Sequence, residues 1–252
     1  MDALFFDYDG TLFVNGKVSE RNVAALSRVR AMGHKIFLNT GRARGFVPKD
    51  AIPLFDGLLC GMTYLEYEGK ELFCRLMPED DVKRLLKAAV SHGIAASIEG
   101  VDACYDYKVH HSTPAVSIDD KIDEFLRSPA VKRIQKISFV GISELPKDFP
   151  PSELVMTSMI SATRKTPYIE GVPKGFTKAT LMETVGRMLS IPQSAMVAFG
   201  DSENDAEMLA FANRRAVIGH APRSLDIYCP YRTKSEEDGV CEAIEYFYGI
   251  KV

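Results

Sequence analysis

The chain opens with a short apolar run that ends at a carboxylate. Residues 3–6 (Ala-Leu-Phe-Phe) are continuously apolar and are followed by Asp7 and then by Asp9-Gly10. An unbroken apolar run that meets a turn signal predicts a buried parallel strand followed by a turn. We therefore expect a strand whose carboxyl end carries acidic side chains.

A helix and a second strand are predicted next. Ser19 is a suitable N-cap, and Gly33 ends the pattern that follows it. Three apolar residues recur between them at helical spacing: Val23, Leu26 and Val29. The apolar run at 35–39 predicts another buried strand. A strand, a helix and a strand within about forty residues indicate a right-handed βαβ unit in a parallel sheet.

The pattern changes after residue 63. Residues 64–73 are typical of a hairpin that turns at Glu68-Gly69, and Pro78 opens an amphipathic helix. Further runs predict strands at 94–98, 134–140 and 154–160 and a helix near 120–126. This mixture indicates an α+β domain, which we place at residues 77–163.

Alternating helices and strands return after this insertion. The pattern predicts a helix at 175–189, a strand at 195–199, a helix after Asn204, a strand at 215–218 and a helix at 236–248. The fold class is therefore α/β. We expect a Rossmann-like parallel sheet with helices on both faces at residues 1–76 and 164–252, interrupted by an α+β cap domain at residues 77–163.

The composition of the chain bears on which partners it binds and in which compartment it acts. A net charge of -3 over 252 residues gives no general attraction to nucleic acid or to an anionic membrane. The five cysteines form no C-x-x-C pair, which favours free thiols over disulfides or a zinc site. The N-terminal apolar run is too short for a signal peptide or a membrane span. We expect a cytoplasmic protein that acts on a small molecule.

Candidate chemistry begins at the first acidic pair. Asp7 and Asp9 are two residues apart at a strand end, where a period of two points both carboxylates the same way. One carboxylate can attack phosphorus while the other transfers protons to and from the departing and attacking oxygens. The pair alone is more often a turn or a calcium loop. Thr11 and Leu12 exclude the calcium loop, because they occupy its ligand and glycine positions.

A second acidic turn follows the strand predicted at 195–199. It contains Asp201, Asn204 and Asp205, and alone it is also consistent with a helix N-cap. Open α/β sheets bind ligands outside the carboxyl ends of their strands, so two acidic strand ends in one sheet indicate a site. Oxygen ligands and an anionic substrate favour Mg²⁺ as the cofactor.

Two further segments supply groups for a phosphate. Thr40-Gly41 follows the second strand and offers a hydroxyl and a backbone N–H. Lys174 precedes the helix at 175–189 and offers a point positive charge. In isolation these residues are consistent with a helix cap and a surface lysine.

Taken together, these segments resemble the haloacid dehalogenase (HAD) superfamily. Its four motifs are matched in order by Phe6-Asp-Tyr-Asp-Gly-Thr-Leu12, by Asn39-Thr-Gly-Arg42, by Lys174-Gly175, and by Gly200-Asp-Ser-Glu-Asn-Asp-Ala-Glu-Met208. The long insertion, with Glu237-Asp-Gly-Val240 near the end, resembles the Cof-type, sugar-phosphatase-like branch (HAD-IIB).

The resemblance implies a role for each acidic residue. Asp7 is expected to be the nucleophile and a metal ligand. Asp9 is expected to be the acid/base, with its backbone carbonyl on the metal. Asp201 is a further expected ligand, and Asp205 is expected to support the metal site. The expected phosphate-binding groups are the N–H of Tyr8, Thr40, Gly41, Lys174 and Asn204.

The resemblance also implies an activity. We expect a Mg²⁺-dependent phosphatase that hydrolyses a small phosphate monoester, such as a sugar phosphate, through an aspartyl-phosphate. A phosphomutase of the same superfamily and a catalytically weak, phosphate-binding regulatory protein are the alternatives. The chain departs from the branch pattern at Cys60-Gly61-Met62 and at His220-Ala221, close to the expected edge of the site.

Overall fold

The chain divides into two compact units, each built on its own sheet. The computed structural model describes residues 1–109, 114–160 and 165–252. The first unit contains residues 1–41, 48–73 and 176–252, and the second contains residues 42–47 and 74–175. The expected insertion ended at residue 163, which lies outside the described residues. The second unit extends farther because strand β13 (Pro167–Val172) pairs with β11 (Ile134–Val140) in its sheet.

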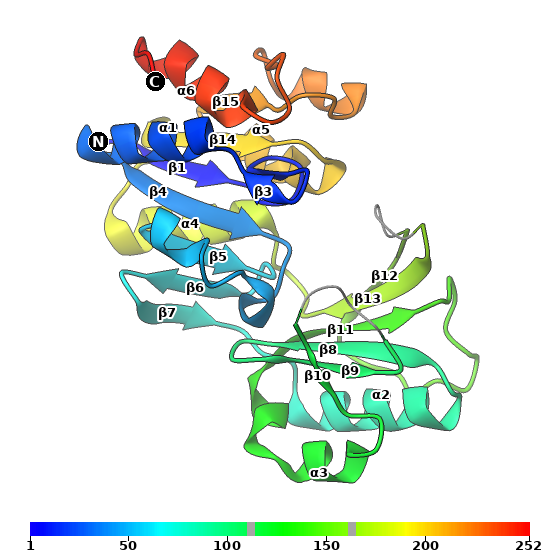
Figure 1. Ribbon diagram of the computed structural model, residues 1–252. Coiled ribbons are helices and arrows are strands. Elements are labelled where there is room, and N and C mark those ends of the chain that lie inside the picture. The colour runs from blue at the N-terminus through cyan, green and yellow to red at the C-terminus, as the bar shows by residue number, and fades with distance from the viewer. Residues whose placement is uncertain (110–113, 161–164) are drawn as a thin grey trace. The chain divides into compact units, whose positions relative to one another are not determined.

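The first unit contains a seven-stranded sheet of order β15-β14-β1-β4-β5-β6-β7 (Figure 1). Five neighbouring strands are parallel: β15 (Arg214–Val217), β14 (Met196–Gly200), β1 (Ala3–Phe6), β4 (Lys35–Thr40) and β5 (Gly57–Cys60). β6 (Tyr64–Tyr67) runs antiparallel to β5, and β7 (Lys70–Cys74) forms the edge. Glu68 and Gly69 adopt positive φ between them, at the predicted turn.

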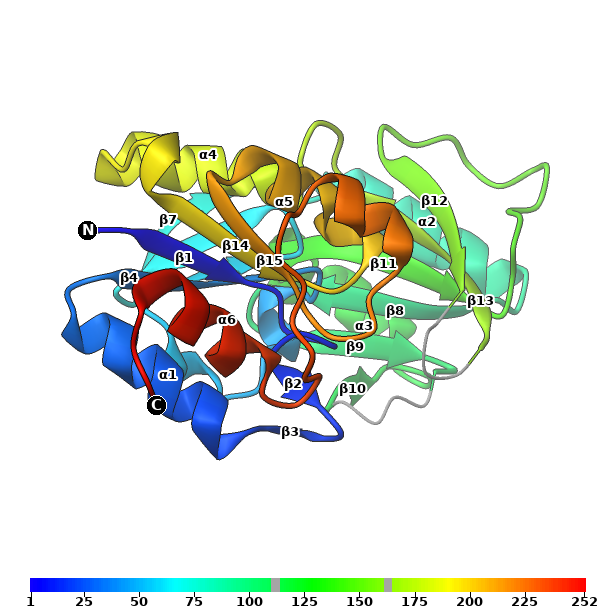
Figure 2. The same ribbon diagram turned by 90° about the horizontal axis from the view of Figure 1, so that it is seen from above.

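Helices cover both faces of this sheet, as predicted. Figure 2 shows α1 (Glu20–Ala31) and α6 (Gly239–Tyr248) on one face, with α4 (Lys178–Leu189) and α5 (Ala206–Phe211) on the other. Ser19 caps α1 by accepting a hydrogen bond from the backbone N–H of Asn22. α4 begins three residues later than expected, because Thr177 and Thr180 form a reciprocal capping box there.

The central strand β1 is held in register by the packing of its side chains. All four of its residues are fully buried, which explains the unbroken apolar run. Phe5 stacks on Phe37 of β4, and Phe6 stacks on Phe199 of β14 with ring centroids 4.4 Å apart. A slip of one residue would turn these rings to the opposite faces, so the packing specifies the register.

A small hairpin after β1 was not predicted. β2 (Phe13–Val14) and β3 (Lys17–Val18) flank a turn in which Asn15 and Gly16 both have positive φ. This is the arrangement of a tight two-residue hairpin turn. Strands of two residues are too short to produce a periodic signal.

The second unit contains a six-stranded sheet of order β10-β9-β8-β11-β13-β12. The remaining strands are β8 (Ala95–Gly100), β9 (Cys104–Tyr107), β10 (Val116–Ser117) and β12 (Val155–Ile160). Figure 1 shows α2 (Glu79–Ser91) and α3 (Ile122–Arg127) against one face. The apolar face of α2 is buried as predicted, through Val82, Leu85, Leu86 and Ala89. Strands β9, β10 and β13 were not predicted.

The sheet of the second unit also holds a buried charged cluster. Lys136 of β11 lies 3.4 Å from a carboxylate oxygen of Glu99 and 2.6 Å from one of Glu170. All three side chains are at most 14% exposed. The ammonium group of Lys136 therefore compensates the charge of two carboxylates that are largely shielded from water.

Three remaining observations concern the described residues as a whole. No helix within residues 1–109, 114–160 and 165–252 combines the length and the apolar character needed to cross a membrane. The five cysteines all lie in the described residues and are thiols outside any disulfide, as predicted: Cys60, Cys74, Cys104, Cys229 and Cys241. Short 3-10 turns lie at Arg44–Phe46, Ile52–Leu54, Pro129–Arg133, Gln193–Ala195, Glu203–Asp205 and Arg223–Ile227.

Candidate active site

The candidate site lies at the carboxyl ends of the central strands of the first unit. Asp7 directly follows β1 and is 5% exposed, and its backbone N–H donates a hydrogen bond to the carbonyl of Phe199 in β14. Asp201 directly follows β14. Because β1 and β14 are parallel neighbours, the two acidic strand ends meet at one edge of the sheet.

A buried lysine joins the acidic residues. Lys178 begins α4 and is 2% exposed, and its Nζ lies 2.5 Å from both Asp7 Oδ1 and Asp205 Oδ1. The same nitrogen lies 3.4 Å from Asn204 Oδ1. Asn39 of β4 donates a hydrogen bond to the backbone carbonyl of Lys178 and so holds the start of this helix. The lysine thus contacts both acidic turns.

Asp205 organises the second acidic turn. It is fully buried, and its Oδ2 accepts hydrogen bonds from the backbone N–H groups of Asp201 and Ser202 and from the Ser202 hydroxyl. Its other oxygen contacts Lys178. A carboxylate with this many donors keeps the loop in one conformation.

The turn after β1 approaches Asp201 very closely. Gly10 has a φ of +88°, and a Cβ at this position would lie 2.3 Å from Asp201 Oδ2. Thr11 Oγ1 donates a hydrogen bond of 2.7 Å to Asp201 Oδ1. Glycine is required here both for the left-handed backbone and for the close approach.

The other expected residues lie on the same elements. Asp9 is exposed in the turn after β1, and the carbonyl of the buried Tyr8 accepts hydrogen bonds from two following N–H groups. Thr40 is the buried last residue of β4, followed by Gly41. Asn204 is exposed, and its Oδ1 accepts hydrogen bonds from Ser202 Oγ and from Lys178.

One sequence-based choice has to be corrected. Lys174 was expected to neutralise the site, but the structure places Lys178 against Asp7. Lys174 is exposed and belongs to the second unit, in the turn before α4. The sequence did contain a signal that Lys178 is buried. Lys178 shares the buried helix face with Leu181, Met182 and Val185, at the spacing of a core position.

Burial disfavours the ionised forms of Asp7 and Asp201. Burial raises the pKa of Asp7 well above its usual value, although Lys178 opposes the shift. Burial raises the pKa of Asp201 to about 6, against the hydrogen bond from Thr11. The two neighbouring carboxylates raise the pKa of Lys178 even though its own burial lowers it, so this lysine stays charged.

These groups form a candidate cation site. Asp7, Asp201 and Asp205 each offer an oxygen within 4.8 Å of the others. When all three carboxylates are ionised, Lys178 compensates one of them and the cluster keeps two excess negative charges. An all-oxygen donor set with that excess suits a hard divalent cation. Without a bound cation, the excess negative charge of these carboxylates would repel an anionic substrate.

Residues 4–244 match the haloacid dehalogenase-like hydrolase family. The chain belongs to this family. The resemblance proposed from the four motifs is confirmed at the level of the family, which is one of hydrolases. The acidic strand ends described above coincide with the first and last of those motifs.

Named relatives of this HAD hydrolase are distant. It is 24% identical over 270 residues to a protein of Arabidopsis thaliana named Endoribonuclease YBEY, chloroplastic; the match covers 96% of this chain but only 45% of that protein. It is 25% identical to the 5-amino-6-(5-phospho-D-ribitylamino)uracil phosphatase YitU of Bacillus subtilis, with 96% of each chain covered.

A solved structure supports the two-part architecture of the HAD fold. The HAD subclass IIB sugar phosphatase BT4131 superposes with a TM-score of 0.79 at 21% sequence identity. The match covers 99% of this chain and all of the other. At this identity the likeness establishes the fold, which is the expected combination of a core and an inserted domain.

Proposed function

We propose that this HAD enzyme is a Mg²⁺-dependent phosphatase that hydrolyses a small phosphate monoester, such as a sugar phosphate or a related metabolite. The observation that carries the proposal is the contact of Lys178 with Asp7 in a cluster of three carboxylates. A buried carboxylate held beside an ammonium group is suited to attack an electron-poor phosphorus atom.

Asp7 is the proposed nucleophile. One of its oxygens attacks phosphorus and forms an aspartyl-phosphate, while the bond from phosphorus to the leaving oxygen breaks. Lys178 opposes the effect of burial on the Asp7 pKa and so favours the ionised carboxylate, and it offsets charge on the transferring group. Asp205 holds Lys178 in place and fixes the turn that carries Asp201.

Asp9 is the proposed acid and base. It is exposed at the turn after β1, two residues beyond the nucleophile, where it can reach a leaving group from solvent. It donates a proton to the leaving oxygen in the first step. It then accepts a proton from the water that attacks the aspartyl-phosphate and releases phosphate.

Mg²⁺ is the proposed cofactor, held by Asp7 and Asp201 with the Asp9 carbonyl as a further oxygen. Asp205 supports this site, since both of its oxygens already accept hydrogen bonds from the protein. When bound, Mg²⁺ would neutralise the substrate phosphate and the cluster. Thr40, Gly41, Asn204 and the Tyr8 N–H are the proposed phosphate-binding groups.

The test is a panel of phosphate monoesters with and without Mg²⁺. We expect Mg²⁺-dependent release of inorganic phosphate from p-nitrophenyl phosphate and from at least one sugar phosphate. Asp7→Asn should abolish turnover, because an amide is a poor nucleophile. Unchanged turnover after removal of the metal, or near-normal turnover of Asp7→Asn, would contradict the proposal.

The same panel distinguishes the two alternatives. Conversion of a hexose phosphate to its isomer without release of phosphate would identify a phosphomutase. Tight binding of phosphate ligands without turnover of any ester would identify a regulatory binding protein.

A further inference from the structure

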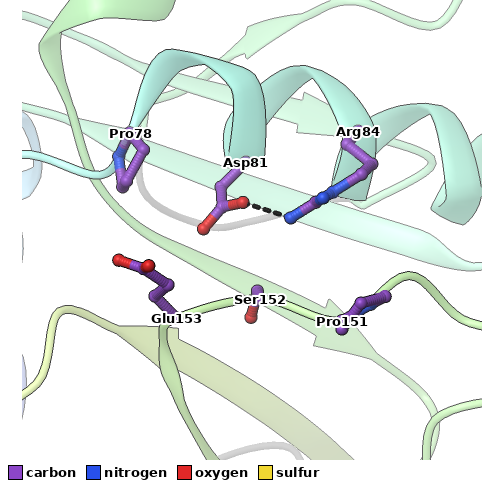
Figure 3. Close-up of a pocket in the computed structure, with 6 residues that line it drawn as sticks. All are labelled: Pro78, Asp81, Arg84, Pro151, Ser152 and Glu153. Atoms are coloured by element: carbon purple, nitrogen blue, oxygen red, sulfur yellow. Dashed lines mark hydrogen bonds and ion pairs between the residues drawn. The ribbon is translucent and has the colours of Figure 1, made fainter.

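The second unit contains a pocket away from the residues assigned to catalysis. Its volume is about 490 Å³, and it lies between the first turns of α2 and the segment before β12 (Figure 3). Six residues line it: Pro78, Asp81, Arg84, Pro151, Ser152 and Glu153. All six belong to one compact unit, so the pocket is described without reference to the first unit.

An incompletely paired carboxylate lies in this pocket. Asp81 is 6% exposed, and its Oδ1 accepts a hydrogen bond of 2.5 Å from Arg84. Its Oδ2 is buried and has no hydrogen-bond partner in residues 1–109, 114–160 and 165–252. A buried carboxylate oxygen without a donor is costly, so a ligand that supplies a donor there gains free energy.

The other residues that line the pocket indicate that a ligand donating to Asp81 should be positively charged. Figure 3 shows Asp81 and Glu153 on facing walls, one from α2 and the other from the segment below it. No ion pair joins Glu153 to any part of the chain that the structure describes. Arg84 is the one basic residue among the six, so the pocket carries an excess negative charge. Pro78 and Pro151 add apolar surface.

We propose that this pocket binds a small organic ligand through a primary ammonium group. An ammonium group has three N–H donors, and Asp81 Oδ2, the Glu153 carboxylate and the Ser152 hydroxyl are the matching acceptors. The exposed Glu153 makes the first contact, and a small rotation of the Asp81 side chain then brings its Oδ2 to the ligand. Aliphatic carbons next to the ammonium group pack on the prolines.

An organic cation fits this pocket better than a metal ion. Asp81 already shares one oxygen with Arg84, and within the described residues only Asp7, Asp201 and Asp205 form a three-carboxylate metal group. The site is independent of the proposed phosphatase activity.

Calorimetric titration of the full-length protein tests the proposal. The probe is 1,4-diaminobutane, and the neutral comparison is 1,4-butanediol at the same ionic strength. We expect saturable binding of the diamine alone, weakened by about tenfold or more in Asp81→Asn and in Glu153→Gln, because each removes a charged hydrogen-bond acceptor. Asp80→Asn is the matched control, since Asp80 is exposed on the same turn of α2 and does not line the pocket.

Each outcome of this titration either supports or overturns the proposed ammonium site. Loss of binding in both pocket variants, with Asp80→Asn unchanged, supports the site. No saturable binding to the wild-type protein, equal binding of the diol, or an equal loss in Asp80→Asn would overturn it. If Asp81→Asn fails to fold by circular dichroism, Glu153→Gln decides alone, since it changes an exposed side chain outside any helix or strand.

Discussion

The ammonium nitrogen of Lys178 lies 2.5 Å from Asp7 Oδ1, although the two residues are 171 positions apart in the sequence. The same nitrogen contacts Asp205, so one side chain links the end of β1 to the turn after β14. Because of this contact we propose Lys178, and not Lys174, as the lysine of the site. The contact also explains how a buried Asp7 can be ionised when its surroundings raise its pKa.

Replacing Lys178 should therefore affect catalysis far more than replacing Lys174. We expect Lys178→Met to lower kcat by roughly 10²–10³-fold, the scale for loss of one preorganised charge-stabilising donor. Lys174→Met should stay close to wild type, because its side chain is exposed. Steady-state kinetics with p-nitrophenyl phosphate measures both.

Loss of the buried charge can also destabilise the fold, so a second lysine variant is needed. Lys178→Arg keeps the charge but cannot place a compact ammonium between two carboxylates. It should remain folded by circular dichroism and still lose most of its turnover. Equal losses in the Lys174 and Lys178 variants would contradict the corrected assignment.

Gly10 should be intolerant of any side chain. In Gly10→Ala the new Cβ would press on Asp201, which then has to move. We expect a higher Mg²⁺ concentration for half-maximal activity and a lower kcat. Gly16→Ala is the control, because Gly16 also has positive φ but has no neighbour within 4 Å. That control should cost about 1–2 kcal/mol of backbone strain and leave the Mg²⁺ requirement unchanged.

The pKa of Asp201 predicts how the metal-free protein responds to pH. Because burial raises this pKa to about 6, protonation of Asp201 stabilises the fold at low pH, and that contribution is lost as the pH rises through 6. Tm in the presence of a chelator should therefore fall mainly between about pH 4, near the usual pKa of an aspartate, and pH 6. Mg²⁺ should reduce the fall, since it replaces the proton. A pH response that Asp201→Asn leaves unchanged would refute this origin.

Lys136 should be essential for the stability of the second unit. Lys136→Met leaves Glu99 and Glu170 buried without their positive partner, which should cost about 3–5 kcal/mol in urea unfolding. Burial already raises the pKa of Glu99, so low pH favours its neutral form in the folded state. The loss should therefore be smaller at low pH and grow as the pH rises through this raised pKa.

Lys132→Met provides the comparison for that variant. Lys132 is 69% exposed, and its ion pair with Glu79 spans 3.9 Å. Such a surface pair contributes about 0–1 kcal/mol, so this variant should unfold close to wild type. A similar loss in both variants would show that the buried cluster has no special role.

The sequence by itself determined the features that depend on neighbours along the chain. The apolar run before Asp7 specified a buried strand because β1 is covered on both faces. Ser19 specified the start of α1 because its hydroxyl satisfies a free N–H of the first turn. The acidic residues at two strand ends were identified because parallel strands place their carboxyl ends at one edge.

Only the tertiary structure decided the contacts between distant segments. The choice of Lys178 over Lys174 depended on where α4 begins and on which of its faces is buried. The contact of Gly10 with Asp201 joins residues 191 positions apart, so no local pattern reports it. Strand β13 was assigned to the second unit because its hydrogen bonds are made with β11, which lies far away in the sequence. Local rules identified the chemical groups of this enzyme, and packing across the chain determined which of them meet.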